Sequence, residues 1–453
     1  MTRIAIIGGG ACGTLAAVHL LRDTAAHVSL VERSGVFGPG IAYRTSHPDH
    51  TLNVPAHLMG GIDEEDGDGF VHWLARQPDA RLDARDFEQL RCDYPARRHY
   101  GDYLRMLLDV AMREHPARAQ LVPAEALRIE WRGAGYRVHL GSGTPFDADQ
   151  VVLCHGNLLP PPLSPASDPN IIEDPWRSVT AIPPNAHVVL VGTGLTMVDT
   201  VLELASAGFR GRLSAVSRHG LLPAEDVQGA AYPDFFDPAI AKRGILAVSR
   251  RLRAEVRAAT ARGVAWQWVV DAFRVHAGAI WRALDDRNRR RFLRHVRSLW
   301  LVHRHRLPAR QMRRIEALRP VVHRARVLAV DRDTAGLHLW IQRPGAQAHE
   351  RFAADRVINC TGPAGDYTRA DMPLIRALFA DGLARPDRYR LGLDVDTDLR
   401  VIDADGQPGR GLFAIGAPTR ATFWEITAVP QFRRQIEALV KMIARTSPTE
   451  RIQ

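Results

Sequence analysis

The sequence predicts an α/β protein with two parallel-sheet domains, the second inserted into the first, and three observations predict it. Residues 3–32 read as a buried strand, a glycine turn, a helix and a second strand, and residues 186–220 repeat this order. Consecutive parallel strands need such a crossover helix. Residues 146–157 align without gaps with residues 352–363, and each copy reads as a strand that ends at a small-residue turn. We therefore expect the chain to leave the first domain near 157 and to re-enter it near 352.

Length and composition are those of an ordinary globular protein. The chain has 453 residues, enough for two or three domains with their own cores, and 46% of them are hydrophobic. No apolar run approaches the ~20 residues that a membrane span requires. The first apolar run ends in three glycines and has no cleavage-site pattern behind it. We expect a cytoplasmic protein with no membrane partner.

Cysteines and charge narrow the function classes further. The four cysteines are widely spaced, with no CxxC and no Cys/His cluster, which argues against a metal site, a disulfide framework and a dithiol redox centre. The formal charge is +10, and nearly all of the 60 basic residues are arginines. Such a balance attracts anionic cofactors and substrates. Nucleic-acid binding is the alternative, but no nucleic-acid module is recognisable, so we expect no nucleic-acid partner.

The first glycine turn has the spacing of a phosphate-binding loop. Residues 3–7 form a short β-branched run suited to a buried parallel strand, and Gly8, Gly10 and Gly13 follow at GxGxxG spacing. The first glycine permits the tight turn, the second lets a pyrophosphate approach the backbone, and the third lets the helix pack on the strand.

The elements around this turn complete the pattern. A helix over 12–23 directs its N-terminal amides at the phosphates. The second strand, 27–32, ends in Glu32, whose carboxylate can accept hydrogen bonds from ribose hydroxyls. Strand, glycines, helix, strand and acid in this order predict a dinucleotide site.

The second glycine turn differs from the first at two positions. Gly192 and Gly194 occupy the first two glycine positions, but Met197 stands at the third, which weakens the helix–strand packing argument. The next strand ends in Arg218 rather than in an acid. An arginine there favours a 2′-phosphate, hence NADPH over NADH. The alternative is a solvated charge at a strand end.

Two such turns in one chain indicate a resident FAD and an exchanging NADPH, since hydride transfer needs both rings in contact. We expect two dinucleotide-binding, Rossmann-like domains and a helical insertion. The FAD-binding domain is split over 1–160 and 325–453, and the NADPH-binding domain covers 180–235. Residues 238–320 contain amphipathic, arginine-rich helices, which we expect to cover the active site. Plain core packing is the alternative for their aromatic stripes.

Several motifs together resemble one family. They are IIGGGACGTLAA (6–17), GPGIAYRTSHPDHTLNVPAHLM (38–59), YPARRHYGDYL (94–104), EDPW (173–176), VGTGLTMVD (191–199), RFLRHVRSLWLVHRHRLP (291–308), VINCTGP (357–363) and FWEITAVPQFRRQ (423–435). Over nearly its whole length the chain resembles the FAD-NAD(P)-binding family of bacterial flavoproteins, which includes aspartate N-monooxygenases that make nitrosuccinate.

The resemblance implies further cofactor contacts. Asn53 should lie near the flavin, and Gly362, the repeat partner of Gly156, should lie at a cofactor-facing turn. A strand should end at Gly416, and a helix should start near Thr427, where its N-terminus would stabilise charge on the reduced flavin.

Arginines provide the candidate substrate contacts. In the HRHR run, Arg304 and Arg306 can clamp a carboxylate bidentately, as can Arg420 in the loop that the resemblance places at the flavin. His305 is the candidate acid or base. The alternative for the HRHR run is a solvated basic face or a charge cluster at a helix C-terminus.

The function that the resemblance implies is an NADPH-dependent flavin monooxygenase. It would use dioxygen, through a C4a-hydroperoxyflavin, to N-hydroxylate a small amino acid or related anionic amine. The FxGxxxHxxx(Y/F) pattern of other flavin monooxygenases is absent between the two glycine turns. Two alternatives stay open: a flavin-dependent dehydrogenase, oxidase or reductase without oxygen insertion, and a non-catalytic FAD-binding redox sensor. The sequence does not decide between a monomer and a homo-oligomer.

Overall fold

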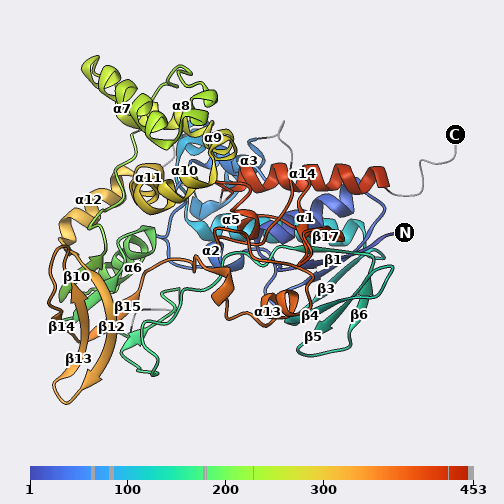
Figure 1. The fold of residues 1–453 in the computed structure, drawn as a ribbon, viewed down its shortest axis with the longest axis horizontal. Coiled ribbons are helices and arrows are strands. Elements are labelled where there is room, and N and C mark those ends of the chain that lie inside the picture. Colours follow the sequence, from blue (N-terminus) through green and yellow to red (C-terminus); the bar gives the residue numbers. More distant parts are fainter. Residues whose placement is uncertain are drawn as a thin grey trace. The chain divides into compact units, whose positions relative to one another are not determined.

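The computed structural model describes residues 1–453 except 63–66, 81–85, 177–178, 180, 228, 427 and 447–453. The chain divides into two compact units. Unit 1 comprises residues 1–158 and 364–453, and unit 2 comprises residues 159–363 (Figure 1).

Unit 1 is built on a six-stranded sheet of order β16-β17-β7-β1-β2-β3. Its strands are β1 (Arg3–Ile7), β2 (His27–Val31), β3 (Ala119–Val122), β7 (Gln150–Leu153), β16 (Arg400–Ile402) and β17 (Pro408–Ala414). All neighbours pair in parallel except β16, which runs antiparallel to β17. The carboxyl ends of the parallel strands therefore share one edge, where open α/β sheets bind their ligands.

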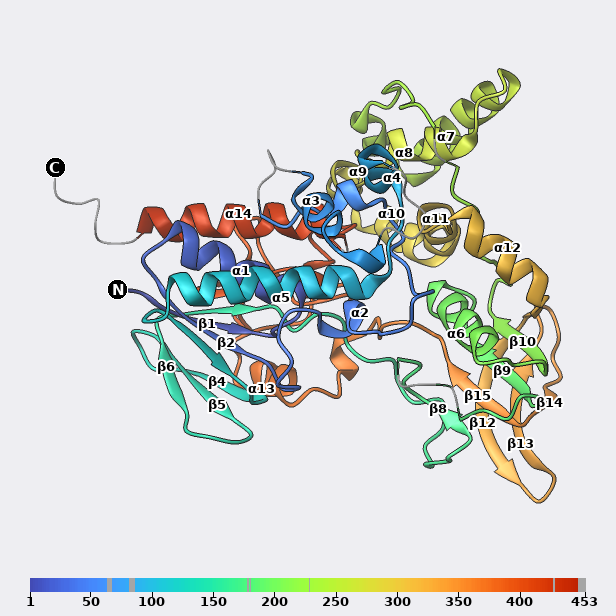
Figure 2. The ribbon, with the colours of Figure 1, turned by 180° about the vertical axis from the view of Figure 1, so that it is seen from behind.

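Helices cover one face of this sheet and a small sheet covers the other. Figure 2 shows α1 (Ala11–Asp23), α5 (Arg97–Glu114) and α14 (Val429–Thr446) stacked along the first face, where apolar side chains form a continuous core. On the second face lie the antiparallel strands β4 (Ala126–Trp131), β5 (Tyr136–Leu140) and β6 (Phe146–Ala148), together with α13 (Pro373–Ala380). The shorter helices are α2 (Gly40–Tyr43), η1 (Ala56–Met59), α3 (Gly69–Leu74), η2 (Pro78–Ala80), α4 (Phe87–Cys92), η5 (Tyr367–Arg369) and η6 (Ala417–Thr419).

Unit 2 repeats this plan on a five-stranded parallel sheet of order β11-β10-β9-β15-β8. The strands are β8 (Ile171–Ile172), β9 (His187–Val191), β10 (Arg212–Ser217), β11 (Val321–Arg324) and β15 (Arg356–Asn359). Helices α6 (Leu195–Ser206) and α12 (Ala309–Leu318) contribute to the core on one face. The antiparallel strands β12 (Arg326–Asp333), β13 (Gly336–Gln342) and β14 (Glu350–Ala354) contribute to the core on the other.

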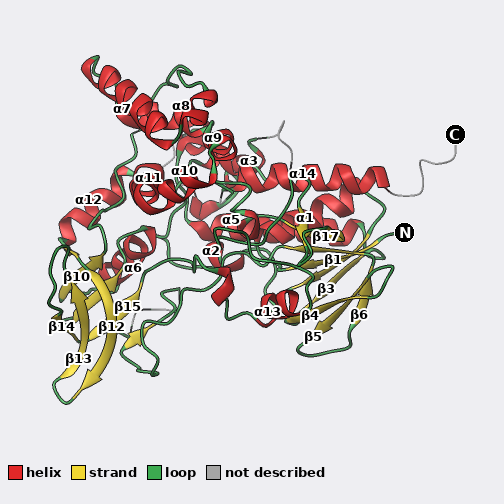
Figure 3. Cartoon of the chain, viewed as in Figure 1, coloured by secondary structure: helices red, strands yellow, loops and turns green. Residues whose placement is uncertain are grey.

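A long helical segment connects β10 to β11. It contains η3 (Pro238–Arg243), α7 (Ile245–Ala261), α8 (Trp266–Arg274), α9 (Ala277–Ala283), α10 (Asp286–Arg291), the π-helical turn η4 (Phe292–Val296) and α11 (Arg297–Arg304), as Figure 3 shows in red. Its aromatic side chains pack on one another: Phe273 contacts both Phe236 and Trp300 edge to face. The aromatic stripes are thus core packing within unit 2.

The domain boundaries that we expected from the sequence need a correction. Residues 325–363 belong to unit 2, and the chain re-enters unit 1 at Ala364. The physical reason is the pairing of β15 with β9, in which Asn359 lies opposite Val191, so the second repeat copy completes the second sheet. Residues 309–318, expected in a separate insertion, form α12 and pack into the core of the same unit. The part of the chain that the structure describes contains no helix both long and apolar enough to cross a bilayer.

Candidate dinucleotide sites

The first glycine turn, in unit 1, leaves no room for side chains. Gly8 has a φ of +110°, and a Cβ there would lie 2.4 Å from the carbonyl oxygen of Cys154. A Cβ at Gly13 would lie 1.8 Å from the carbonyl oxygen of Gly8, so α1 packs directly on the turn. Gly10 is the N-cap of α1 and no side chain caps the helix. The N-terminal amides of α1 are therefore available to an anion such as a pyrophosphate.

The sequence predicted a strand that ends in Glu32; β2 ends one residue earlier, at Val31, and Glu32 shapes the turn. Its Oε2 accepts a hydrogen bond from the backbone amide of Gly9 at 2.9 Å, and its Oε1 accepts from the amide and the hydroxyl of Ser34 at 3.0 and 2.8 Å. Each carboxylate oxygen has two acceptor positions. The half-buried carboxylate is therefore fixed in direction, and one acceptor position, on Oε2, remains for a ribose hydroxyl.

The turn after β17 is anchored to α14. Gly416 has a φ of +76°, and its amide donates to Oε1 of Gln435 at 2.8 Å. The Gln435 amide nitrogen donates in turn to the hydroxyl of Thr419 at 3.0 Å. Thr427 lies outside the described residues, and α14 begins at Val429. Asn53 is half-buried at a bend just before η1, and no contact of its side chain identifies a ligand.

A polar group that the sequence analysis missed lies at the carboxyl ends of β7 and β17. His155 Nε2 lies 3.3 Å from the hydroxyl of Tyr367, and its enclosed Nδ1 has no partner among the described residues. Burial lowers the pKa of His155 to about 4, so the imidazole is neutral at pH 7. Arg420 donates to Oδ1 of Asn157 at 3.0 Å, and burial lowers its pKa. His155 directly follows Cys154 of the repeat, but its partner Tyr367 is 212 residues away in the sequence. The contact between His155 and Tyr367 could therefore be found only from the structure.

The second glycine turn, in unit 2, resembles the first at its first glycine but differs at its second and third glycine positions. Gly192 has a φ of +117°, and a Cβ there would lie 2.2 Å from the carbonyl oxygen of Cys360. A Cβ at Gly194 would meet no atom within 4 Å. Protein packing therefore requires glycine at the first position but not at Gly194, where the open space suits the close approach of a ligand. Met197 is fully buried in the core that α6 shares with the sheet.

The sequence repeat corresponds to equal contacts in the two units. Asp149 Oδ2 accepts from the amide of Arg3 at 2.7 Å, and Asp355 Oδ2 accepts from the amide of His187 at 2.7 Å. Each aspartate thus fixes the start of the strand that leads to a glycine turn. Gly362 has a φ of +76° at the turn that follows β15. The repeat is structural, and each copy borders one of two cradles. By a cradle we mean a glycine turn together with the N-terminus of the helix that follows it.

The strand end that follows the second turn is basic. Ser217 Oγ accepts from the hydroxyl of Thr193 at 2.9 Å and from the amide of Gly220 at 3.0 Å. Arg218, the next residue, is exposed, and its guanidinium has no hydrogen-bond or ionic partner among the residues that the structure describes. An anionic group of a ligand can therefore meet it without displacing a protein carboxylate.

The HRHR run is placed differently from what we expected of a substrate clamp. The buried Arg306 donates to Asp226 at 2.7 Å, to Asp271 at 2.6 Å and to the carbonyl of Gln267 at 3.2 Å. Two carboxylates pair with this guanidinium, so its donors are engaged within unit 2 and are not free to clamp a substrate carboxylate. Arg304 is buried in the last turn of α11, and His305 is the half-buried residue that ends it.

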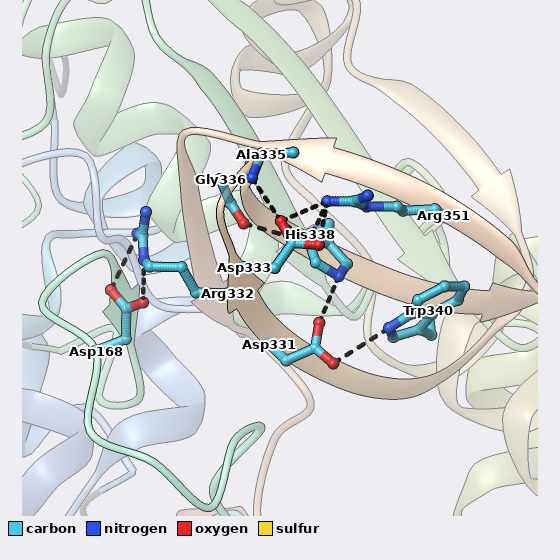
Figure 4. Close-up of polar contacts among 9 residues, drawn as sticks. All are labelled: Asp168, Asp331, Arg332, Asp333, Ala335, Gly336, His338, Trp340 and Arg351. Carbon is cyan, nitrogen blue, oxygen red and sulfur yellow. Dashed lines mark hydrogen bonds and ion pairs between the residues drawn. The ribbon is translucent and has the colours of Figure 1, made fainter.

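A second polar cluster, on β12–β14, also has a structural explanation (Figure 4). His338 is 3% exposed, with Nε2 2.6 Å from Oδ1 of Asp331. Arg351 pairs with Asp333 at 2.7 Å, and the indole of Trp340 donates to Asp331 at 3.2 Å. These groups satisfy one another across the antiparallel strands. Within the described ranges no group of three or more His, Cys, Asp or Glu side chains is arranged to hold a metal ion.

Comparisons with known proteins agree with this geometry. Residues 5–158 match the FAD-NAD(P)-binding family. The family resemblance is thus confirmed over the first cradle, and FAD and a nicotinamide dinucleotide are the cofactors of that family. No curated protein matches the sequence.

Solved structures show the same fold over the whole chain. The reduced ornithine hydroxylase of Pseudomonas aeruginosa has a TM-score of 0.65 and 15% identity, over 98% of this chain and 99% of that chain. The ornithine N-hydroxylase of Kutzneria sp. 744, with reduced FAD, NADP⁺ and L-ornithine, has a TM-score of 0.60 and 18% identity over the same shares. The bacillithiol disulfide reductase of Staphylococcus aureus has a TM-score of 0.54 and 12% identity, over 99% and 100%. The predicted α/β fold, shared by flavin-dependent monooxygenases and reductases, is confirmed.

Proposed function

We propose that the protein is an FAD- and NADPH-dependent monooxygenase that N-hydroxylates a small amino acid or a related anionic amine. The observation that carries the proposal is the pair of equivalent glycine cradles, one bordered by Glu32 and the other by the unpaired Arg218. The fold likeness to two ornithine hydroxylases supports amine oxygenation over other flavin chemistry.

The residues of the first cradle fit FAD. Gly8 and Gly13 admit no side chain, and the N-terminus of α1 has no side-chain cap, so backbone amides can hold the pyrophosphate. Glu32 is oriented so that Oε2 can accept a hydrogen bond from a ribose hydroxyl. When bound, FAD would accept a hydride from NADPH and, once reduced, would activate dioxygen. The chain itself contributes binding, orientation and exclusion of water.

The residues of the second cradle fit NADPH. Gly194 leaves open space at the N-terminus of α6, where a pyrophosphate can approach, and Arg218 offers an unpaired guanidinium for the 2′-phosphate. An acid at this strand end would repel that phosphate, and none stands there.

Arg420 is the substrate contact that we propose. Its guanidinium lies at the carboxyl-end edge of the unit 1 sheet and donates a hydrogen bond to Oδ1 of Asn157. A planar guanidinium has donors left for a bidentate pair with a substrate carboxylate. The neutral His155 nearby adds no competing positive charge. The roles of Arg304 as a substrate contact and of His305 as an acid or base stay predictions.

The test is stopped-flow spectroscopy of the FAD-loaded protein. Anaerobic NADPH should bleach the flavin, and oxygen with the correct amine should give a product heavier by one oxygen atom. If the reduced flavin is instead reoxidised at once, one hydrogen peroxide forms for each NADPH consumed and every amine is recovered unchanged, the result would favour an oxidase or reductase. A yellow protein that does not consume NADPH would favour a redox sensor.

A further inference from the structure

We propose that Arg324, at the end of β11, forms the 2′-phosphate subsite together with Arg218. The inference rests on the proposed function, because it takes NADPH to be the dinucleotide of the second cradle. It adds a specificity-determining residue that lies more than a hundred positions from the glycine turn in the sequence.

Strand register places Arg324 beside the phosphate-facing strand end. Strands β10 and β11 pair in parallel with Ser217 opposite Arg324, and the amide of Ala325 donates to the carbonyl of Ser217 at 2.9 Å. Residues opposite one another in a parallel pair point to the same face of the sheet. Arg324 therefore shares the face of Ser217.

That face is the one that carries the glycine turn and α6. The hydroxyl of Thr193, between Gly192 and Gly194, donates to Ser217 Oγ at 2.9 Å. Two positions earlier on β10 and β11, Ala215 and Val322 pack into the core that includes α6. Neighbouring strands are only about 4.8 Å apart, and an extended arginine side chain is longer than this distance. The guanidinium of Arg324 can therefore reach a group bound at Ser217.

The turn after β10 passes directly over Arg324. Gly220 has a φ of +63°, and a Cβ there would lie 3.2 Å from the Cβ of Arg324. The amide of Gly220 donates to Ser217 Oγ at 3.0 Å, which folds the turn containing Arg218 back toward the same strand end. An arginine in the turn after β10 and an arginine at the end of β11 thus flank Ser217.

Both guanidiniums lack a protein counter-charge. Arg218 and Arg324 are exposed, and neither has a hydrogen-bond or ionic partner among the residues that the structure describes. Two cations held near each other repel, and a phosphate monoester of charge near −2 relieves that repulsion while accepting bonds from both. This chemistry separates NADPH from NADH, because the two differ only in the 2′-phosphate.

The test is calorimetric binding of 2′,5′-ADP and of 5′-AMP to the FAD-loaded protein. The Arg324→Ala variant should lose about 10- to 100-fold in affinity for 2′,5′-ADP, the loss expected for a charge-assisted contact, and should bind 5′-AMP as before. Arg324→Lys should recover part of the loss. Arg212→Ala, at the opposite end of β10, is the matched control and should leave both affinities unchanged.

The outcomes separate this inference from the proposed function. If wild-type protein prefers 2′,5′-ADP, and Arg218→Ala removes the preference while Arg324→Ala does not, Arg324 is no part of the subsite. If wild-type protein binds both ligands equally, the assignment of NADPH fails as well. A preference that depends on both arginines, in a protein that hydroxylates no amine, would support the subsite and overturn the monooxygenase.

Discussion

Replacing Gly194 by valine tests whether the second cradle holds a ligand or is merely a tight turn. Gly194 has φ −87° and ψ −168°, an extended conformation that valine adopts readily. A Cβ there meets no atom within 4 Å. Since the helix end has no side-chain cap to lose, we expect the free energy of unfolding to fall by no more than about 1 kcal/mol.

Binding should respond far more strongly than folding. The two methyl groups would stand where the pyrophosphate approaches the amides of α6. Losing one charge-assisted hydrogen bond there costs about 2 kcal/mol, which raises Kd for NADP⁺ by ~30-fold. Titration calorimetry of the FAD-loaded variant measures this change, and thermal unfolding measures stability.

Gly192→Ala is the contrasting variant. Its φ of +117° and the approach of its Cβ to within 2.2 Å of a carbonyl oxygen should destabilise unit 2 by about 3 kcal/mol or more. Gly194→Val protein that binds NADP⁺ with the wild-type Kd would refute the cradle. So would a loss of stability as large as that of Gly192→Ala, because the space at Gly194 would then not be free.

Three further variants address unit 1. Gly10→Val should yield colourless protein, because its Cβ would lie 3.2 Å from the Cα of Gly40 and its methyl groups would crowd the N-terminus of α1, and retention of FAD after gel filtration would contradict this. Arg420→Lys should raise KM for the amine by about 10-fold, through loss of the bidentate fork, while anaerobic flavin reduction by NADPH stays unchanged; an unaltered KM would exclude Arg420 from the substrate site. His155 has its pKa lowered to about 4, so the unfolded state binds the proton first and stability should fall as pH drops from about 6.5 to about 4, by at most about 3 kcal/mol. Unfolding of His155→Gln at pH 7 and pH 4.5 should show a shallower decline, and an equal decline would mean that His155 does not carry it.

Local patterns predicted the cradles because their causes are local. The φ of Gly8 and the approach of α1 at Gly13 depend on a few neighbouring residues, so GxGxxG spacing after a β-branched run reports them directly. The repeat also identified aspartates with equal roles, Asp149 and Asp355, because each binds the start of an adjacent strand.

Contacts between distant segments were outside the reach of such patterns. From the sequence we expected Arg306 to be available to a substrate carboxylate. In the structure it pairs with Asp226 and Asp271, which lie far from it in the sequence. The re-entry point was misplaced because both copies of the repeat end a strand next to a glycine turn. Which sheet the second copy joins depends on the pairing of β15 with β9, and that pairing is a tertiary choice.

If the first cradle holds a resident FAD and the second an exchanging NADPH, as we propose, the differences between the cradles predict that salt weakens only the binding of the nicotinamide dinucleotide. In unit 1, glycine at position 13 lets α1 pack directly on the turn, whereas the matching place in unit 2 holds the buried side chain of Met197. The second cradle therefore depends more on its exposed arginines, and attraction between exposed charges is screened by salt. We expect Kd for NADP⁺ to rise several-fold between low and high ionic strength, while FAD stays bound through gel filtration at both. Calorimetry and the flavin absorbance of the eluted protein measure the two quantities. A salt-independent Kd would show that the backbone of the turn, and not Arg218 and Arg324, provides most of the binding energy.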